Sequence, residues 1–335
     1  MSFEWIRGRA WAAALTLGVS LALPAAALAD VKTLRFGTAS PAGDLPVEMM
    51  YVFKEWAERS AIGEFDVQIH HTGTLVRQGT EIVALQRGSA ELTILSWWDI
   101  ADRIPEYSIL TVGYLFKDWS HVQWFMDGDL GKEYIKRIGD ELGVHILDYY
   151  YAGPRIVNLR EKRLVNVPAD LKGVKLRMPG SPAFLLLGEA LGADPVPMPL
   201  NDVYLGLETG TVDGQDNPLS TTYRARFHEV TKQIVLTYHS IPANMLAISK
   251  TAWDAMTPHE QAIVENAARA AMSFNDTNKL LDDARLVETL KAAGLDVHEP
   301  DRNAFREHVL KVFRDNGYMD TAPAGWVEAI EAAAK

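Results

Sequence analysis

Two short segments of the chain contain side chains that could hold a small anion. Residues 170–179 read DLKGVKLRMP, and this pattern predicts a short apolar strand with Arg177 at its end. Residues 207–219 read LETGTVDGQDNPL, in which the carboxamide of Asn217 lies in a predicted turn bounded by glycine and proline. A guanidinium presents a rigid fork of donors that matches the two oxygens of a carboxylate. The pattern therefore predicts a protein that captures a small organic acid.

Arg155 is a second guanidinium in a comparable position, because it comes soon after another predicted strand, residues 144–151. In open α/β sheets, ligands bind outside the carboxyl ends of the strands, so Arg155 and Arg177 are both expected to face a cleft. The alternative for either arginine is a surface position or an ion pair with a neighbouring acid. Asn217 precedes a proline, which favours an extended backbone that can direct the amide into the same cleft. The alternative for Asn217 is a simple turn residue.

The pair Trp97–Trp98 is the strongest aromatic feature, and it follows the predicted strand 90–96 directly. If one ring faces the cleft, it offers a flat apolar wall or a face for a cation. The alternative is that both rings belong to the hydrophobic core. Ser96 and Gln78 are candidates for a hydroxyl contact and an amide contact with the same ligand.

No pattern typical of a metal site, a nucleotide site or a nucleophile elbow occurs in the chain. The nine histidines are scattered, and Asp213 and Asp216 lack the remaining oxygen positions of a calcium loop. Because cysteine is absent, a disulfide framework, a thiolate metal site and a cysteine nucleophile are excluded. We therefore predict no cofactor and no metal ligands. A catalytic triad assembled only in space stays open.

The chain has 335 residues, of which 48% are hydrophobic, and a formal net charge of −11. This length suits about two domains, and the composition is that of a globular protein. An acidic chain repels nucleic acid and anionic membrane surfaces, so neither is expected as a partner. Any anion site must therefore depend on positive charge gathered locally.

The first 29 residues have the organisation of a cleaved secretory signal. Arg7 and Arg9 form a basic start, residues 10–23 are apolar, and residues 27–29 read ALA, a small-x-small cleavage site. A membrane anchor, which needs roughly 20 apolar residues, is the weaker alternative. We predict that residues 1–29 are removed and that the mature protein occupies an extracytoplasmic space, most simply a bacterial periplasm.

Alternating strand and helix patterns predict an α/β fold with a largely parallel sheet. The expected strands are residues 31–38, 65–70, 90–96, 144–151, 174–178, 194–199, 234–237 and 295–298. The expected helices before residue 250 are residues 46–61, 79–87, 121–142 with a break at 127–129, 184–191, and a helix through Thr209 that is capped by Asn201.

Residues 252–293 consist almost entirely of good helix formers, with one breaker at Pro258. Thr257 and Glu260 form a predicted capping box around this proline. A helix longer than the diameter of one domain is a natural spine that joins two lobes. Because no flexible linker is present, two domains most simply arise from a chain that crosses between them more than once. A cleft between such lobes is a preferred place for a ligand.

With these motifs the chain resembles the solute-binding proteins of TRAP (tripartite ATP-independent periplasmic) transporters. The resemblance covers nearly all of the chain after the predicted signal. The motifs that carry it are residues 170–179, GADPVPMP at 192–199, VYLGLETG at 203–210 and VDGQDNPL at 212–219, with weaker support from YLF at 114–116 and FHEV at 227–230.

The resemblance implies a two-lobed periplasmic binding-protein fold, with a ligand cleft between the lobes, a hinge that closes it and a long helix that spans both. It implies a first lobe of residues 31–154 plus about 243–282, and a second lobe of residues 155–242 plus about 283–335. These boundaries are expectations for the structure.

The resemblance also implies which side chains hold the ligand. Arg177 is expected to form a two-pronged salt bridge to the ligand carboxylate, and Arg155 and Asn217 match two further contact positions. The family's usual Gln-Glu-Asn appears here as Gln-Asp-Asn at 215–217, which retains the asparagine. Three residues match first-lobe positions that vary and select the ligand: Gln78, Ser96 and Trp97.

We therefore expect a periplasmic, non-enzymatic, monomeric protein that delivers a small organic carboxylate to the membrane subunits of a TRAP transporter. The tryptophan pair favours a ligand with a ring or an apolar face, such as a uronate, an aromatic acid or a cyclic osmolyte. Two other functions stay open: a secreted hydrolase or lyase acting on an acidic substrate, and a sensor subunit that signals to a kinase. The sequence alone leaves open the identity of the ligand, an accompanying metal ion and the oligomeric state.

Overall fold

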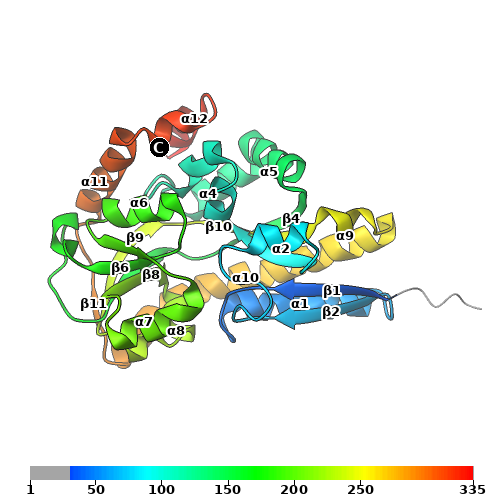
Figure 1. Cartoon of the computed structure of the whole chain (residues 1–335), viewed down its shortest axis with the longest axis horizontal. Coiled ribbons are helices and arrows are strands. Elements are labelled where there is room, and N and C mark those ends of the chain that lie inside the picture. The colour runs from blue at the N-terminus through cyan, green and yellow to red at the C-terminus, as the bar shows by residue number, and fades with distance from the viewer. Residues whose placement is uncertain (1–30, 335) are drawn as a thin grey trace, which may run out of the picture. The chain divides into compact units, whose positions relative to one another are not determined.

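The computed structural model describes residues 31–334, which lie within one compact unit (Figure 1). The predicted signal of residues 1–29 lies outside the described residues. Among residues 31–334, no helix combines the length and the apolar character needed to cross a membrane. The fold is two-lobed and α/β, with one β-sheet in each lobe, and this confirms the predicted fold class.

The first sheet has five strands in the order β2-β1-β3-β10-β4. Its strands are β1 (Lys32–Gly37), β2 (Phe65–His70), β3 (Leu92–Ser96), β4 (Val144–Tyr151) and β10 (Ala243–Ser249). β1 is parallel to β2 and β3, whereas β10 is antiparallel to both of its neighbours, β3 and β4.

The second sheet has six strands in the order β11-β9-β5-β8-β6-β7. Its strands are β5 (Arg155–Leu159), β6 (Lys175–Met178), β7 (Asp194–Pro197), β8 (Gly214–Pro218), β9 (Gln233–Ser240) and β11 (Asp296–His298). β6 is parallel to β7 and β8, and β9 is parallel to β11, whereas β5 is antiparallel to β8 and β9.

Each sheet is largely parallel, as predicted, but contains one antiparallel strand: β10 in the first sheet and β5 in the second. The antiparallel pairings come from β5 and β10, which the sequence patterns did not identify as strands. Every residue of β5 is buried, and so is nearly every residue of β10. A short apolar run that is buried on both faces shows no alternation, and this explains why the periodicity missed these two strands.

Helices cover both sheets, and most lie where the sequence predicts them. They are α1 (Leu45–Ser60), α2 (Glu81–Gln86), α3 (Trp97–Ala101), α4 (Trp119–Asp127), α5 (Asp129–Leu142), α6 (Pro182–Ala190), α7 (Val203–Thr209), α8 (Leu219–Arg224), α9 (Lys250–Asp254), α10 (Pro258–Ala292), α11 (Arg302–Asp315) and α12 (Trp326–Ala333). Short 3₁₀ helices are η1 (Pro105–Thr111), η2 (Pro168–Leu171), η3 (Leu200–Asp202), η4 (Phe227–Glu229) and η5 (Tyr318–Thr321).

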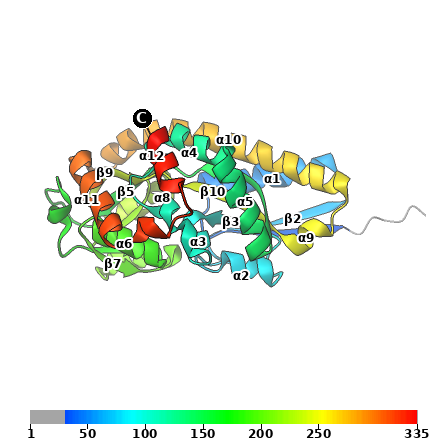
Figure 2. The same ribbon diagram turned by 90° about the horizontal axis from the view of Figure 1, so that it is seen from above.

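Helix α10 is the predicted long helix and packs against elements of both lobes. Its 35 residues give it a length of roughly 50 Å, and it contacts α1 and β4 of one lobe and α8 and β11 of the other (Figure 2). The predicted capping box is confirmed: the backbone N–H of Thr257 donates to Glu260 at 2.6 Å, and the backbone N–H of Glu260 donates to the Thr257 hydroxyl at 3.3 Å. Pro258 fills the first helical position, where its missing N–H is not needed.

The chain passes from the first sheet to the second between β4 and β5, returns between β9 and β10, and crosses again along α10. The first two crossings lie side by side, because the backbone N–H of Ala152 donates to the carbonyl of Pro242 at 3.4 Å. Gly153 at the first crossing has a φ of +88°, in the left-handed region that favours glycine. These adjacent segments are the natural position for a hinge.

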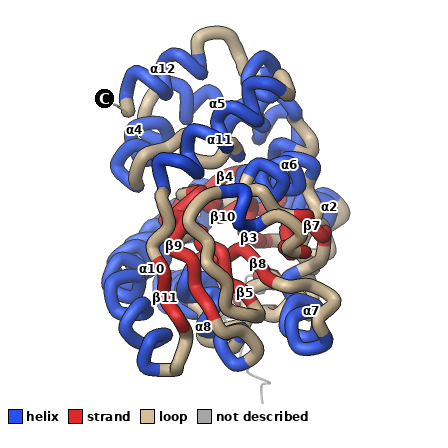
Figure 3. Tube along the Cα trace, turned by 90° about the vertical axis from the view of Figure 1, so that its left-hand side faces the viewer, coloured by secondary structure: helices blue, strands red, loops and turns tan. Residues whose placement is uncertain are grey.

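The C-terminal helices gather with α4 and α5 at one end of the fold (Figure 3). α11 contacts α6 of the second lobe, whereas α12 contacts α4, which follows the first three strands of the first sheet. The ring of Trp326 in α12 stacks on Tyr107 with 5.2 Å between centroids. The end of the chain therefore bridges the two lobes, and the predicted boundaries at 154, 242 and about 282 stay a prediction.

Gly192, just after α6, offers a test of the close packing at this turn. Its φ is +91°, and an added Cβ would lie 2.0 Å from the carbonyl oxygen of Pro168. Gly173 has a similar φ of +79° but no atom within 4 Å of an added Cβ. We expect Gly192→Ala to lower the free energy of unfolding well beyond the roughly 1–2 kcal/mol that a left-handed alanine costs in Gly173→Ala. Urea denaturation measures the free energy of unfolding of both variants. Equal losses in the two would contradict the close approach of Gly192 to the carbonyl oxygen of Pro168.

Candidate functional site

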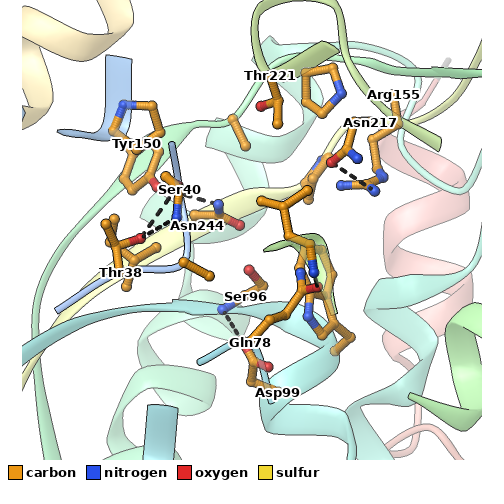
Figure 4. Close-up of a pocket in the computed structure, with 18 of the residues that line it drawn as sticks. Thr38, Ser40, Gln78, Ser96, Asp99, Tyr150, Arg155, Asn217, Thr221 and Asn244 are labelled. Atoms are coloured by element: carbon orange, nitrogen blue, oxygen red, sulfur yellow. Dashed lines mark hydrogen bonds between the residues drawn. The ribbon is translucent and has the colours of Figure 1, made fainter. Parts of the chain in front are cut away.

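A cavity of about 80 Å³ is lined by residues from both sheets and from α10 (Figure 4). Polar side chains form much of its wall. They are Thr38, Ser40, Gln78, Glu81, Ser96, Asp99, Tyr150, Tyr151, Arg155, Asn217, Thr221, Asn244, Asn275 and Lys279.

Most of the predicted contact residues come together here. Those that line the cavity are Gln78, Ser96, Arg155 and Asn217. Arg177 and Trp97 are not part of the lining, although Arg177 is bonded to Gln78. Whether each of these side chains touches a ligand stays a prediction.

Trp98, not Trp97, is the tryptophan at the cavity. α3 begins at Trp97, so successive side chains point about 100° apart around the helix axis. Trp97 turns into the core and packs on Phe116, with 5.1 Å between ring centroids. Trp98 lines the cavity and packs edge-on against Phe184 at 4.7 Å. Trp97 is therefore a core residue, as the alternative held for both rings, whereas Trp98 is not.

Arg177 lies within β6 and is fully buried. Its Nε donates to the carbonyl of Met198 at 2.7 Å, and its Nη2 donates to the side-chain oxygen of Gln78 at 2.6 Å. Its Nη1 has no hydrogen-bond partner among residues 31–334. Burial lowers the pKa of Arg177 to about 9, because the charged form loses its hydration. The side chain thus holds a desolvated charge and one donor nitrogen, Nη1, that has no partner in the described chain.

Arg155 has a different environment, because an internal carboxylate neutralises it. Its Nε donates to Asp216 Oδ2 at 2.6 Å and its Nη2 to Oδ1 at 3.0 Å, in a bidentate pair. Burial by itself would raise the pKa of Asp216, but the charge of Arg155 and the hydrogen bonds from His239 and Arg155 hold that pKa well below its usual range. The ion-pair alternative noted for the arginines is therefore the observed state of Arg155. Arg155 comes after β4, as predicted, but it also begins the next strand, β5.

Two aromatic rings further constrain the guanidinium of Arg155. It lies 5.5 Å from the ring centroid of Trp98 and 5.1 Å from that of Phe184. Such cation–π contacts stabilise a desolvated cation by roughly 0.5–2 kcal/mol. Because Trp98 follows β3 and Phe184 belongs to α6, this stack joins the two lobes beside the cavity.

Asn217 lies in β8 and not in a turn, so the predicted turn is wrong. Its backbone pairs with Ile156 of β5. Its Nδ2 donates to Gln215 Oε1 at 2.6 Å, and its Oδ1 accepts from Arg155 Nη2 at 3.4 Å. Gln215 in turn donates to Thr222 at 3.1 Å. The amide of Asn217 is thereby held in one orientation at the cavity wall.

Lys279 is a cavity residue that the sequence patterns did not identify. It belongs to α10, is 1% exposed, and donates from Nζ to the hydroxyl of Ser220. The side chain passes against Gly153, where an added Cβ would lie 2.4 Å from Lys279 Cε. Asn275, one helical turn earlier, also lines the cavity. In the sequence, only their spacing of four residues within the predicted helix indicates that the two side chains lie on the same face of that helix.

Glu81 and Asp99 are buried carboxyl groups in the cavity wall that the sequence patterns also missed. Burial raises the pKa of Glu81 well above its usual value, and the charge of Asp99 raises it further. Burial raises the pKa of Asp99 to about 7, although the hydrogen bond from the N–H of Ser96 opposes the shift. That N–H donates to Asp99 Oδ2 at 2.8 Å, so Asp99 also caps α3.

Hydrogen bonds across the cleft hold the lobes together over the cavity. Gln78 Oε1 accepts from Arg177 and also from the backbone N–H of Leu200 at 3.0 Å. Asn201 Nδ2 donates to the carbonyl of Thr72 at 2.6 Å, so its predicted role as a helix cap is wrong. On the opposite side, Thr221 donates to Asp44 at 2.9 Å. The structure is thus a closed form.

No group of three or more histidine, cysteine, aspartate or glutamate side chains among residues 31–334 is arranged to hold a metal ion. The positive groups at or beside the cavity are Arg155, Arg177 and Lys279. They suit an anion, because guanidinium and ammonium groups are strong donors to carboxylate oxygens.

Two lobes that close over a small polar cavity with buried cations define a ligand-binding protein of the periplasmic type. The chain belongs to the bacterial extracellular solute-binding proteins of family 7, whose model matches residues 36–318. The predicted membership of the TRAP solute-binding proteins and the predicted periplasmic location are thereby confirmed.

Individual relatives support this assignment. The chain is 30% identical over 295 residues to the 2,3-diketo-L-gulonate-binding periplasmic protein of Escherichia coli, covering 88% of this chain and 89% of the relative. It is 26% identical to the sialic acid-binding periplasmic protein of Vibrio cholerae, covering 90% and 93%. A TRAP periplasmic solute-binding protein from Roseobacter denitrificans, solved with bound 3-deoxy-D-manno-oct-2-ulosonic acid, matches with a TM-score of 0.86 and 37% identity, covering 91% and 100%.

The pair between Arg155 and Asp216 gives a testable dependence of stability on pH. We expect Asp216→Asn to lower the free energy of unfolding by about 3–5 kcal/mol near neutral pH, because it leaves a buried cation without its counter-charge. The folded pKa of Asp216 lies below the unfolded value of roughly 4, so the contribution is complete above about pH 5 and declines as the pH falls further.

Urea denaturation of the wild-type protein and of Asp216→Asn at several pH values measures this difference directly. Asp202→Asn is the control, because Asp202 forms only an exposed pair with Arg77 and should contribute about 0–1 kcal/mol. A difference that stayed constant down to about pH 3 would contradict an ionised Asp216.

Proposed function

We propose that the closed cavity holds a small organic carboxylate against Arg177, and that the loaded, closed form passes it to the membrane subunits of a TRAP transporter. The observation that carries this proposal is the guanidinium of Arg177, which is fully buried, has no ion-pair partner in the described chain and has no hydrogen-bond partner at Nη1. Burying a charge without a counter-charge is costly, so the site favours an anionic guest.

Gln78 supports this interpretation, because its side-chain oxygen lies where a ligand oxygen would be expected. That oxygen accepts from Arg177 Nη2 and from the N–H of Leu200. A carboxylate oxygen at this point would receive the same two bonds with a full negative charge, and charge-assisted bonds are stronger. Gln78 would then turn its amide toward the remainder of the ligand.

The relatives support the class of ligand. Their names and titles include 2,3-diketo-L-gulonate, sialic acid, L-galactonate, D-glucuronate and 3-deoxy-D-manno-oct-2-ulosonic acid, all of which are carboxylic acids. We infer a ligand of this kind for the present protein. Closure follows from differential contact: a ligand that touches both lobes binds the closed state more tightly and shifts the population toward it.

The family consists of binding proteins rather than enzymes, and we propose the same for this chain. One observation favours the alternative of a hydrolase or lyase: Asp99 has a pKa of about 7 at the cavity wall, as a general acid or base would. Incubation with a panel of sugar acids, followed by product analysis, separates the two, because a binding protein returns its ligand unchanged. The sensor alternative would require a partner kinase in place of membrane transport subunits.

We expect Arg177→Lys to weaken the binding of L-galactonate or 3-deoxy-D-manno-oct-2-ulosonate by roughly 10- to 100-fold. One ammonium cannot reproduce two parallel donors, and a charge-assisted bond contributes about 1.5–3 kcal/mol. Isothermal titration calorimetry measures the affinities. Arg226→Lys, at an exposed pair with Glu229, is the matched control and should bind as the wild-type protein does. An Arg177→Lys protein with unchanged affinity for every bound acid would refute the assigned role.

A further inference from the structure

A second cavity, of about 630 Å³, lies behind the two adjacent crossing segments at the hinge, on the side away from the ligand cavity. Ala152, Arg155 and Pro242 line the ligand cavity, whereas Pro154 and Ile241 line the second one. The volume is within the range of roughly 300–1,000 Å³ that is typical of ligand sites. We call this cavity the hinge pocket, and its wall includes Lys117, Trp119, Tyr151, Tyr238, Arg302 and Arg306.

The wall of the hinge pocket comes from both lobes. Trp119 begins α4 and packs on Tyr151 of β4, in the first sheet, with 5.0 Å between ring centroids. On the other side, Tyr238 belongs to β9 of the second sheet, and Arg302 and Arg306 belong to α11, which contacts β9. Because the hinge lies between the two cavities, a rotation that opens the ligand cavity brings these two sides of the hinge pocket together.

Aromatic rings form a large part of this wall. The rings of Trp119 and Tyr151 lie together on one side, and the guanidinium of Arg302 lies 5.3 Å from the ring centroid of Tyr238 on the other. Tyr238 and Tyr114, which also line the pocket, have φ angles of +45° and +59°, in the left-handed region that bulky residues rarely adopt. Such backbone strain gathers at functional sites.

Three cations line the hinge pocket, and none of them has a close ion-pair partner within residues 31–334. Lys117 and Arg306 form no ion pair in this part of the chain, and Arg302 has only a long one, with Glu299 at 3.8 Å. All three side chains belong to exposed residues. A small molecule can therefore enter the pocket from solvent while the lobes are closed.

The two carboxylates of the wall, Asp118 and Asp301, are used as helix caps. Asp118 accepts from the backbone N–H of His121 at 2.9 Å. Asp301 accepts from the backbone N–H groups of Asn303 and Ala304, each at 3.0 Å. The three cations exceed these two carboxylates by one charge, which suits a guest with a single negative charge.

We propose that the hinge pocket is a second binding site, which takes a small aromatic monocarboxylate and, when occupied, stabilises the closed form. The carboxylate pairs with Arg302 and Arg306, whose spacing of four residues places them on one face of α11. The ring packs against Trp119 and Tyr151. An occupant between the two sides of the pocket resists the rotation that opens the ligand cavity, so it binds the closed state more tightly and shifts the population toward it.

Other guests would use less of this wall. An aliphatic carboxylate would pair with the cations but leave the aromatic rings uncovered. A neutral aromatic compound would cover the rings but leave the cations unpaired, and a cation would be repelled by Lys117, Arg302 and Arg306. The site goes beyond the proposed function, because neither Arg177 nor Lys279 lines it.

Isothermal titration calorimetry with 2-naphthoate tests the site in the purified protein. Two analogues separate the contributions, because 2-naphthamide has no charge and cyclohexanecarboxylate has no aromatic ring. We expect 2-naphthoate to bind at least roughly threefold more tightly than either analogue, since exposed ion pairs and ring contacts are each of modest strength. Equal affinities for the three compounds, or no measurable binding of 2-naphthoate at millimolar concentration, would overturn the proposal.

Variants then locate the bound probe. The double variant Arg302→Gln/Arg306→Gln should bind 2-naphthoate roughly tenfold more weakly, because it removes both guanidinium groups. The matched control is Arg314→Gln on the same helix, since Arg314 pairs with Glu331 outside the pocket. Arg177→Lys should also leave the affinity for 2-naphthoate unchanged. A loss in Arg177→Lys without a loss in the double variant would place 2-naphthoate in the ligand cavity and overturn the proposal.

The effect on closure is measured by titrating L-galactonate with and without saturating 2-naphthoate. We expect 2-naphthoate to raise the affinity for L-galactonate by roughly fivefold or more, and linkage requires L-galactonate to raise the affinity for 2-naphthoate by the same factor. The double variant should lose this coupling. Competition between the two acids, or an unchanged affinity for L-galactonate, would refute the stabilisation of the closed form.

The outcomes separate this inference from the proposed function. If Arg177→Lys leaves the binding of L-galactonate unchanged, the proposed function fails, whereas the titrations of 2-naphthoate still decide whether the hinge pocket is a site. If 2-naphthoate binds equally well to the wild-type protein and to the double variant, the hinge pocket is refuted while carboxylate capture at Arg177 stands.

Discussion

Arg177 is fully buried, and no carboxylate within residues 31–334 pairs with it. This buried charge, which has no direct ion-pair partner, is the constraint on which the closed cavity depends. Burial removes the hydration of the guanidinium, and the neutral oxygens of Gln78 and Met198 replace only part of it. An anion beside Nη1 would replace the lost hydration with a direct electrostatic attraction. Closure of the lobes and occupancy of the site are therefore two aspects of one equilibrium.

Arg155 shows how the same residue type can serve a different purpose a short distance away. Asp216 neutralises it, His239 supports Asp216 with an Nε2 contact of 3.2 Å, and two aromatic rings enclose it. Its geometry is thus set before any ligand arrives. Arg155 thus forms a rigid part of the wall, whereas Arg177 gains a counter-charge when an anion binds. Because the wall is ordered in advance, less conformational entropy is lost on binding.

The sequence predicted the elements whose side chains alternate or follow helical spacing, such as α1, β2 and α10, because those patterns are local. It missed β5 and β10, whose burial on both faces erases the alternation. Arg177, Arg155 and Asn217 were found through motifs, but their partners were not. That Asp216 would pair with Arg155, and that Lys279 would reach the cavity past Gly153, depend on packing between distant segments. The sequence patterns did not predict α3, in which Trp97 packs into the core and Trp98 lines the cavity.

Helix α10 spans both lobes and also carries Asn275 and Lys279 into the cavity wall. The helix that spans both lobes is thus also part of the cavity wall. Its outer side includes Leu280 and Leu281, which are 53% and 65% exposed and far less constrained by packing. Since apparent affinity scales with the fraction of molecules in the competent form, changes in the stiffness of this helix can retune affinity without altering a single ligand contact. Substitutions in this helix outside the cavity can therefore change the affinity for the ligand without changing the specificity.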